Sequence, residues 1–334
     1  MFTAKLCLSS ILIGVLTFAM VGCEKHSKKE KYYLVTVNVG IPYWKTAANG
    51  FDKAAAELGV QTDIVGPDRY DPQAERDALR KAVQAKPSGI LVSSAEASVL
   101  KEDIDAAIAA GIPVITIDSD SPGGKRLLFI GTNNYQAGVM GGELTVKLLG
   151  GKGQVVVFTM PGQRNLDERL NGYRAAFANT QIKIVEVIDI QGDPMIAFNK
   201  AREVGGKYKG QINGYICLEA QGGKEVADVI ERQGAKGKVL IAMDTDEETL
   251  EWIRKGVINA TIAQKPFTMA YIGLKMLDDL HHSKTNLQDD ALLRGPFARL
   301  PSFVDTGATL IDKSNLDEFI KTRDEASGKT QGSR

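Results

Sequence analysis

The feature that most constrains the fold is an alternation of short apolar runs with stretches of helical period, which occurs twice along the chain. The apolar runs of the first half are rich in Val and Ile: Tyr33–Val39, Gln61–Val65, Gly89–Val92 and Val114–Ile117. The stretches between them repeat apolar residues at helical spacing: Ala47–Leu58, Pro72–Ala85 and Ser98–Ala110. Apolar strands that alternate with helices predict a parallel sheet covered on both faces.

The second half repeats the pattern. Its predicted strands are Gln154–Phe158, Ile182–Val187, Gly214–Leu218 and Val239–Met243. Its predicted helices are Leu166–Asn179, Met195–Tyr208, Lys224–Gln233 and Glu247–Lys255. Two halves of the same order predict an α/β protein made of two similar, doubly wound parallel-sheet domains.

Several segments are predicted to pass between the two domains. Residues 129–134 form one compact crossing, and the strand and break at 260–266 form a second. The apolar helix Thr268–Leu280 has no place in the second half, so we assign it to the first. The tail crosses once more at residues 303–319. We therefore expect a multi-strand hinge between two lobes. The first lobe comprises residues 32–132 plus 265–303, and the second comprises residues 133–264 plus 304–325. Such an arrangement is suited to closure around a ligand. Residues 326–334 are predicted to be a disordered tail.

The N-terminus has the pattern of an export signal. Lys5 precedes an apolar run, Leu6–Val21, that is short for a spanning helix. The run ends in Met20-Val21-Gly22-Cys23, which resembles a bacterial lipobox in which the Cys is lipidated. Residues 1–23 are thus predicted to be a lipoprotein signal peptide, and the charged residues 24–31 a tether; a plain secretory signal is the alternative.

Charge and cysteine content exclude several classes of protein. Without residues 1–22 the chain has 40 basic and 41 acidic residues, since Lys5 is the only charge removed. This balance does not favour a nucleic-acid partner, which needs a basic face. Cys7 leaves with the signal and Cys23 is predicted to carry lipid, so Cys217 has no disulfide partner.

Enzymatic and metal motifs were sought without success. The sequence has no Walker phosphate loop and no Gly-x-Ser-x-Gly nucleophile elbow. His26 falls in the predicted tether, and His281 and His282 end a helix, where a cation is expected. We therefore predict no catalytic residues, no cofactor and no metal.

Five short motifs, in this order and spacing, resemble the periplasmic sugar-binding proteins of the ribose-binding type, which serve ABC transporters. They are Pro42-Tyr43-Trp44, Gly111-Ile-Pro-Val-Ile-Thr-Ile-Asp118, Glu168-Arg169-Leu-Asn-Gly172, Ile241-Ala-Met-Asp244 and Ala260-Thr-Ile-Ala-Gln264. The resemblance covers residues 32–325. It implies the type I periplasmic binding protein fold, with a sugar held in the cleft between the two lobes.

The resemblance implies a set of ligand-binding residues, each with a plainer alternative. Tyr43 and Trp44 match an aromatic pair suited to the apolar face of a sugar, although both could simply pack beneath their helix. Asp118 matches a carboxylate that accepts sugar hydroxyls, and its alternative is a turn or helix-cap residue. Arg169 matches a guanidinium that contacts sugar oxygens, with Asn165 one turn earlier on the same face; the alternative is a surface arginine paired with a neighbouring acid.

The remaining predicted ligands lie in the second half or at the hinge. Asp244 matches a family carboxylate, and the residues after it lack the spacing of a calcium loop. Gln264 matches a hinge amide that can donate and accept. Glu219 falls near a position where the ribose-type pattern has Asn, and it is a candidate only. Gly40 and Ile41 also stand where that pattern has a polar Asn, which argues against copying ribose as the ligand.

We therefore expect a non-enzymatic solute-binding protein of an ABC transporter. It would bind a monosaccharide or polyol, act as a monomer with the permease as partner, and be anchored to a membrane through Cys23 in the periplasm or at the cell surface. The alternative is a sugar-sensing module for a membrane receptor or kinase, which would use the same cleft.

Overall fold

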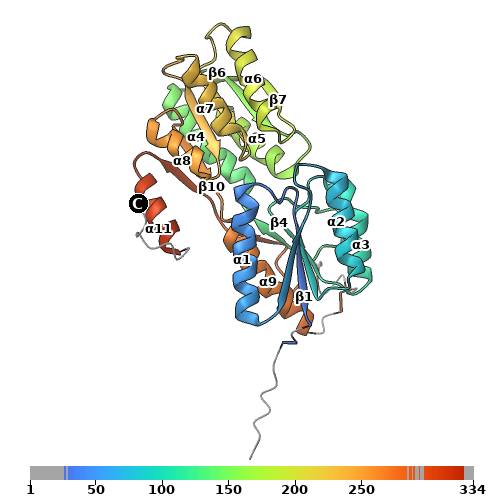
Figure 1. Cartoon of the computed structure of the whole chain (residues 1–334). Coiled ribbons are helices and arrows are strands. Elements are labelled where there is room, and N and C mark those ends of the chain that lie inside the picture. Colours follow the sequence, from blue (N-terminus) through green and yellow to red (C-terminus); the bar gives the residue numbers. More distant parts are fainter. Residues whose placement is uncertain are drawn as a thin grey trace, which may run out of the picture.

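The computed structural model describes residues 26–326 except 28, 284, 285, 288, 290–292 and 294–296. Two α/β lobes stand one above the other in Figure 1. The predicted signal peptide and its Cys23, and the tail from residue 327, lie outside the described residues. Within the described part, no helix is both long enough and apolar enough to cross a membrane.

The first sheet, which defines lobe 1, has the strand order β11-β5-β4-β3-β1-β2. Its strands are β1 (Lys31–Val35), β2 (Gln61–Val65), β3 (Gly89–Val92), β4 (Val114–Ile117), β5 (Phe129–Gly131) and β11 (Phe303–Asp305). They pair in parallel throughout. Helices α1 (Pro42–Leu58) and α9 (Pro266–His282) cover one face, and α2 (Pro72–Gln84) and α3 (Ala97–Ala109) cover the other (Figure 1).

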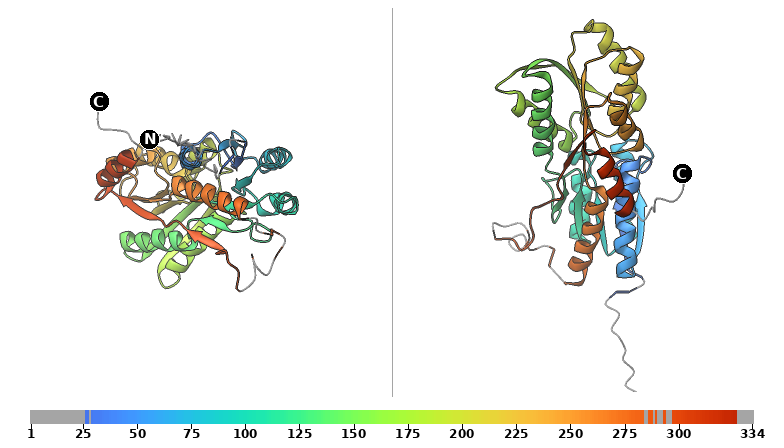
Figure 2. Two further views of the ribbon diagram at one scale, coloured as in Figure 1. Left: turned by 90° about the horizontal axis from the view of Figure 1, so that it is seen from below. Right: turned by 90° about the vertical axis from the view of Figure 1, so that its left-hand side faces the viewer.

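The second sheet, which defines lobe 2, has the matching order β12-β10-β9-β8-β6-β7. Its strands are β6 (Lys152–Thr159), β7 (Gln181–Asp189), β8 (Gly214–Cys217), β9 (Val239–Met243), β10 (Ala260–Ala263) and β12 (Thr309–Asp312). Only β12 pairs antiparallel. The lobe's helices are α4 (Asn134–Leu149), α5 (Arg164–Phe177), α6 (Pro194–Lys207), α7 (Gly222–Arg232), α8 (Glu247–Lys255) and α11 (Leu316–Ala326). Figure 2 shows α4 and α5 on one side of this sheet and the later helices on the other.

The two sheets therefore confirm the predicted class of two doubly wound, parallel-sheet lobes. Each lobe has its own hydrophobic core, and the buried residues of α9, including Leu274 and Leu277, belong to the core of lobe 1. This placement confirms the assignment of the 268–280 helix to the first half. The chain crosses between lobes after β5, after β10 and after β11.

The third crossing lies between β11 and β12, at residues 306–308. Phe303–Asp305 pairs with β5 of lobe 1, so lobe 1 extends two residues beyond the boundary predicted at 303. The predicted crossing at 129–134 contains β5, which sequence analysis missed, and it leads directly into the equally missed α4.

The first strand is shorter than predicted, because β1 ends at Val35 rather than near Gly40. Thr36 N and Val39 N still bond to the carbonyls of Val65 and Pro67, so the chain follows β2 for a few residues. Pro67 has no backbone N–H and cannot donate a hydrogen bond back to the first segment, which prevents regular strand pairing there. The loop thus formed delivers the chain to Pro42 at the first turn of α1, where proline is favoured.

Candidate functional site

Two aspartates occupy equivalent positions at the carboxyl ends of strands in the two lobes. Asp118 follows β4 with φ 64°, and Asp244 follows β9 with φ 65°. Their backbone N–H groups bond to the next strand, at Ile130 O (3.0 Å) and Ile262 O (2.9 Å). The left-handed conformation is unfavourable for a residue with a side chain and is concentrated at functional sites. Each lobe therefore holds one carboxylate, in the same constrained conformation, at the carboxyl end of its sheet, where open α/β sheets commonly bind ligands.

Tyr43 is the partner of Asp118 in lobe 1. It lies in the first turn of α1, and its hydroxyl donates to Asp118 Oδ1 at 2.6 Å. Asp118 caps no helix, since the next described helix begins at Asn134. The structure therefore does not support the helix-cap alternative for Asp118. The residue does lie at the centre of a tight turn, in which Ser119 N donates to Ile117 O at 2.7 Å, and its side chain accepts the hydrogen bond from Tyr43.

Trp44 is placed differently from its neighbour. It is 2% exposed and belongs to the hydrophobic core of lobe 1, whereas Tyr43 is only partly buried. The two rings meet edge to face with centroids 5.2 Å apart. Trp44 thus supports the ring of Tyr43 from the core side. This agrees with the alternative in which the aromatic residue packs beneath its helix. A direct contact of Trp44 with ligand stays a prediction.

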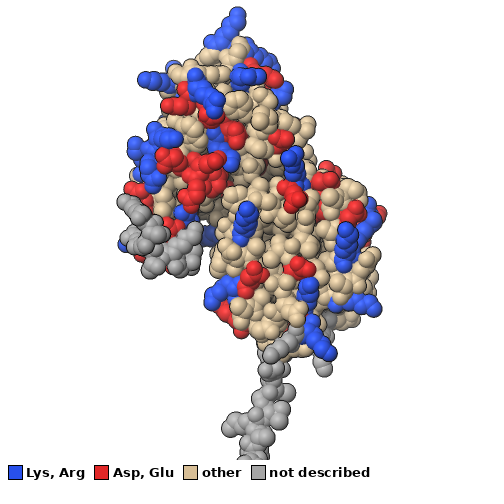
Figure 3. Space-filling view, viewed as in Figure 1, with Lys and Arg blue, Asp and Glu red and all other residues tan. Residues whose placement is uncertain are grey.

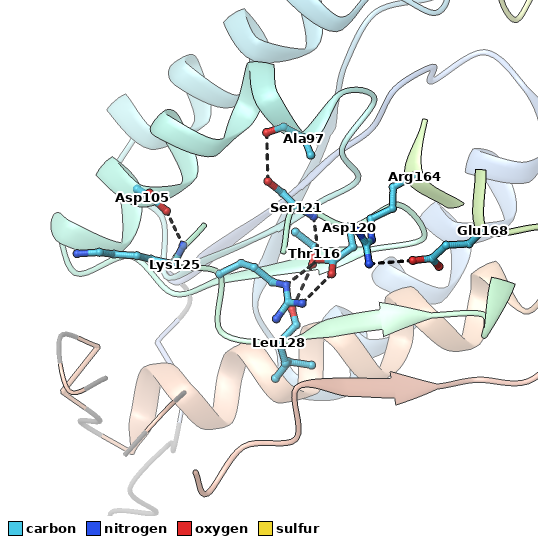
Figure 4. A network of polar contacts seen from close by, with 10 residues as sticks. Ala97, Asp105, Thr116, Asp120, Ser121, Lys125, Leu128, Arg164 and Glu168 are labelled. Atoms are coloured by element: carbon cyan, nitrogen blue, oxygen red, sulfur yellow. Dashed lines mark hydrogen bonds and ion pairs between the residues drawn. The ribbon is translucent and has the colours of Figure 1, made fainter. Parts of the chain in front are cut away.

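Arg169 is a buried hub in lobe 2. It is 2% exposed, and its guanidinium donates to Asn134 Oδ1 (2.8 Å), Leu218 O (2.6 Å) and Gln264 Oε1 (2.8 Å). The acids proposed as surface partners are engaged elsewhere. Glu168 pairs with Arg164 at 2.9 Å (Figure 4), and Asp167 accepts from Gly162 N at 3.2 Å. Arg169 is therefore not a surface arginine.

A close approach of two helices positions Arg169. At Gly138 of α4, an added Cβ would lie 2.0 Å from the Arg169 carbonyl oxygen of α5, and at Gly172 it would lie 2.2 Å from Tyr135 O. Only glycine allows the two backbones to come this near. The contact also brings Asn134, at the start of α4, within hydrogen-bond distance of the guanidinium.

Gln264 connects Arg169 to Asp244. Its Oε1 accepts from Arg169, and its Nε2 donates to Asp244 Oδ1 at 3.0 Å. Gln264 directly follows β10, at the second crossing between the lobes. The amide thus uses both its acceptor and its donor at the hinge. The backbone carbonyl of Asp244 is held as well, by the Thr261 hydroxyl at 2.7 Å.

Glu219 and Asn165 complete the set, and both are buried. Both oxygens of Glu219 accept backbone N–H groups at the start of α7, from Gln221 (2.7 Å) and Gly222 (2.5 Å). A carboxylate there also complements the helix dipole. Asn165 Oδ1 faces the N–H of Leu166 at 3.0 Å, in the first turn of α5. Glu219 therefore has a structural task, and its contact with ligand remains a prediction.

Burial of several acids around one arginine perturbs their protonation. Burial raises the pKa of Asp244 to about 7 and that of Glu219 to about 7, and it raises the pKa of Asp118. The Arg169 charge opposes the rise in all three cases. One buried cation thus stands among three carboxylates that belong to different lobes. Tyr70 of lobe 1 packs against both hydrophobic cores, so the two lobes are in contact at this residue.

The structure therefore brings together Tyr43, Asp118, Arg169, Glu219, Asp244 and Gln264, which sequence analysis predicted. It adds Asn134 and the carbonyl of Leu218, which only the fold places next to Arg169. Within the sequence, the only signal for Asn134 was its position at the end of the predicted crossing at residues 129–134.

Asp120, two residues after the site, has a structural task of its own. Its carboxylate accepts from both Arg126 Nε and Nη2 at 2.7 Å, and from the Thr116 hydroxyl at 2.6 Å (Figure 4). These contacts fix the loop after β4.

An open groove of about 490 Å³ lies elsewhere, between α7 and α8 around Trp252. Acidic side chains such as Glu247, Glu248 and Glu251 line it and gather on this face of lobe 2 in Figure 3. Glu247 and Glu248 lie in the first turn of α8, where Asp246 caps the helix by accepting from Thr249 N, so both acids complement the helix dipole. Two lysines line the groove as well, and Lys224 pairs with Glu248 at 3.0 Å.

Comparison with known proteins shows which family the chain resembles. The chain matches the model described as a periplasmic binding protein domain over residues 32–285. It is 26% identical to the D-allose-binding periplasmic protein of Escherichia coli K12, over 81% of this chain and 90% of that one.

Solved structures show the same fold over most of this chain. AraP, an arabinose-binding protein of Geobacillus stearothermophilus, is 35% identical with a TM-score of 0.72, and the match covers 87% of this chain and 99% of AraP. An ABC transporter solute-binding protein of Burkholderia graminis, solved in complex with D-arabinose, is 26% identical with a TM-score of 0.78 and matched coverage of 87% and 98%.

Proposed function

The chain belongs to the periplasmic binding protein domain family, and from this membership we propose that it binds a monosaccharide or related polyol for an ABC transporter outside the cytoplasm. The ligand lies between Tyr43 and Asp118 of lobe 1 and Arg169, Asp244 and Gln264 of lobe 2. The protein performs no chemistry on it. Binding shifts the equilibrium toward a closed form, which docks on the permease.

The observation that carries the proposal is the meeting of matched carboxylates from two lobes around one buried arginine. Carboxylates accept hydroxyl hydrogen bonds, and a guanidinium and an amide donate to ring and hydroxyl oxygens. A sugar offers both kinds of partner. Arg169, Gln264 and Asp244 form one hydrogen-bonded chain, and Gln264 lies where the chain crosses between the lobes. Ligand that contacts Arg169 or Asp244 therefore acts on a residue at the hinge.

The ligand class is testable by thermal shift. Aldopentoses, aldohexoses, ketohexoses, deoxysugars and polyols are screened, with D-arabinose and D-allose included because relatives are named for them or solved with them. A true ligand raises the melting temperature, since it binds only the folded state. Calorimetry then gives the affinity, with Glu251→Gln on the exposed face of α8 as a control outside the cleft. If no compound in the panel stabilises the protein, the proposal fails.

We also propose that Cys23 carries lipid and anchors the protein to a membrane. The support is the sequence that precedes it, Met20-Val21-Gly22 after an apolar run. Cells fed a radiolabelled or clickable fatty acid should label the protein, and Cys23→Ser should abolish the label. Equal labelling of the variant would contradict the anchor and leave the sugar-binding proposal intact.

A further inference from the structure

A second polar cluster lies at the base of lobe 1, at the start of β1 and the end of α9 (Figure 1). His26 and Glu30 come from the segment before β1, and Asp278 and His282 come from the last turns of α9. One nitrogen or carboxylate oxygen from each of the four residues lies within 4.8 Å of every other. The strands run from this end toward the interlobe site, so the two sites lie at opposite ends of the lobe.

The individual distances approach those of a coordination sphere. His26 Nδ1 lies 3.1 Å from Asp278 Oδ1 and 3.8 Å from Glu30 Oε2, and His282 Nε2 lies 3.5 Å from Glu30 Oε2. Four ligands of a tetrahedral zinc ion stand roughly 3.3 Å apart, because Zn–N and Zn–O bonds measure about 2.0–2.1 Å. Closing the cluster on an ion therefore needs only small movements of side chains.

The surroundings orient the potential ligands. His282 Nδ1 lies 2.9 Å from the Asp278 carbonyl oxygen, so Nδ1–H can donate there and leave the Nε2 lone pair directed toward Glu30. The Tyr32 hydroxyl donates to Asp278 Oδ1 at 3.1 Å, and Glu30 Oε1 accepts from Ser27 N at 2.8 Å. A histidine that bonds a carbonyl through one nitrogen and presents the other is the usual arrangement of a metal ligand.

Two atoms of the cluster lack hydrogen-bond partners among the described residues. They are His26 Nδ1 and Glu30 Oε2, and both are shielded from solvent. Asp278 is 1% exposed, and within the described residues the ion pairs of Asp278 and Glu30 involve only these two histidines. Buried carboxylates require a compensating cation.

We propose that His26, Glu30, Asp278 and His282 bind a divalent transition-metal ion of the zinc type. Two imidazoles with two carboxylates favour Zn²⁺ and its neighbours over Mg²⁺ or Ca²⁺, which prefer oxygen ligands alone and more of them. The ion ties the segment predicted as a free tether to the end of α9. Cys23 precedes His26 by three residues, so the ion would also hold lobe 1 close to a membrane anchor. The inference does not depend on the identity of the sugar.

The test uses full-length protein without a histidine tag, stripped with EDTA and titrated with ZnCl₂ by calorimetry. We expect one site with a micromolar or lower dissociation constant. Saturating Zn²⁺ should raise the melting temperature by about 3–5 °C, as expected for a ligand at roughly 100 times its dissociation constant. Co²⁺ should give the visible absorption of a tetrahedral site, and Mg²⁺ should give no heat.

Neighbouring histidines supply a matched pair of variants. His282→Ala removes a ligand and should weaken Zn²⁺ binding by about 100-fold or more. His281→Ala removes a histidine whose ring contacts His282 but which lies outside the cluster, and it should change affinity less than threefold. Glu30→Gln serves if His282→Ala fails to fold, and it should weaken binding at least tenfold. Absence of saturable Zn²⁺ binding, or equal losses in His281→Ala and His282→Ala, would overturn the proposal and leave a purely structural cluster of polar side chains.

Discussion

Replacing Asp244 by Asn separates the charge of this residue from its shape. Asn is the same size and tolerates the left-handed φ of 65° at this position better than most residues. Its side-chain oxygen can still accept the Gln264 amide that now bonds Asp244 Oδ1 at 3.0 Å. The variant therefore removes a negative charge from the cleft with little change in packing.

The stability effect follows from the raised pKa of Asp244. A carboxyl with a pKa of about 7 when folded and 3.8 otherwise binds more protons in the folded state between those values. The proton uptake of this group therefore contributes its full stabilisation of the folded state below about pH 4. This stabilisation is lost as the pH rises through about 7. At pH 8 the ionised group costs about 4 kcal/mol at most. Because Arg169 loses a nearby anion in the variant, we expect Asp244→Asn to stabilise the ligand-free protein by roughly 2 kcal/mol at pH 8 and by less at pH 5.

The effect on binding has the opposite sign. A charge-assisted hydrogen bond contributes about 1.5–3 kcal/mol, so losing one from a sugar hydroxyl should weaken binding roughly 10- to 100-fold. Urea unfolding at pH 5 and pH 8 measures stability, and calorimetry with the best ligand from the screen measures affinity. Glu251→Gln, which removes an acid from the exposed face of α8, should leave affinity unchanged.

Two results would refute this reasoning. If Asp244→Asn binds sugar as tightly as the unmodified protein at pH 8, the carboxylate does not contact the ligand. The second result concerns the change in the free energy of unfolding between pH 5 and pH 8. If this change is the same in the variant and in the unmodified protein, the pKa of Asp244 is not raised by burial.

Three further substitutions test the supports of the site. Tyr43→Phe removes the hydroxyl that bonds Asp118 at 2.6 Å, and we expect about tenfold weaker binding by calorimetry with little loss of stability. Trp44→Ala empties a position that is 2% exposed, and urea unfolding should show a loss of about 3–5 kcal/mol, whereas a minor loss would mean that the ring is not a core residue. Gly138→Ala places a Cβ 2.0 Å from the Arg169 carbonyl, so it should cost about 1–3 kcal/mol and weaken binding by displacing α5; unchanged affinity would show that the helix contact does not position Arg169.

Elements with a clear apolar pattern were predictable from the sequence, whereas β5 and α4 were not. The strands Gly89–Val92 and Val114–Ile117 have the predicted bounds, since each is a continuous apolar run buried on both faces. Strand β5 has only three residues and acquires its structure from pairing with β4 and β11. Helix α4 contains Gly138, Gly141 and Gly142, whose low helix propensity hides it in the sequence although close packing on α5 requires them.

The two polar clusters were predictable to different degrees. Asp118 and Asp244 could be found because each ends an apolar strand, where open α/β sheets bind ligands. The partners Asn134 and Leu218 O could not, because they reach Arg169 only through the packing of α4, α5 and β8. No sequence pattern indicates that His26 meets His282, since 256 residues separate them and each histidine alone has an ordinary explanation. Neither segment has a local sequence pattern that indicates this contact.

The charge of the interlobe cluster suggests how ligand binding and closure are coupled. Asp118, Glu219 and Asp244 share one guanidinium, and burial raises the pKa of each carboxyl. A closed cleft without ligand therefore either takes up protons or bears an excess of negative charge, and at neutral pH both options disfavour closure. We expect a sugar bound at the proposed site to donate hydroxyl hydrogen bonds to these carboxylates and to stabilise their ionised forms. The free energy that favours the closed state is then expected to come in part from relieving the buried acids, and a carboxylate on each lobe makes that gain depend on closure.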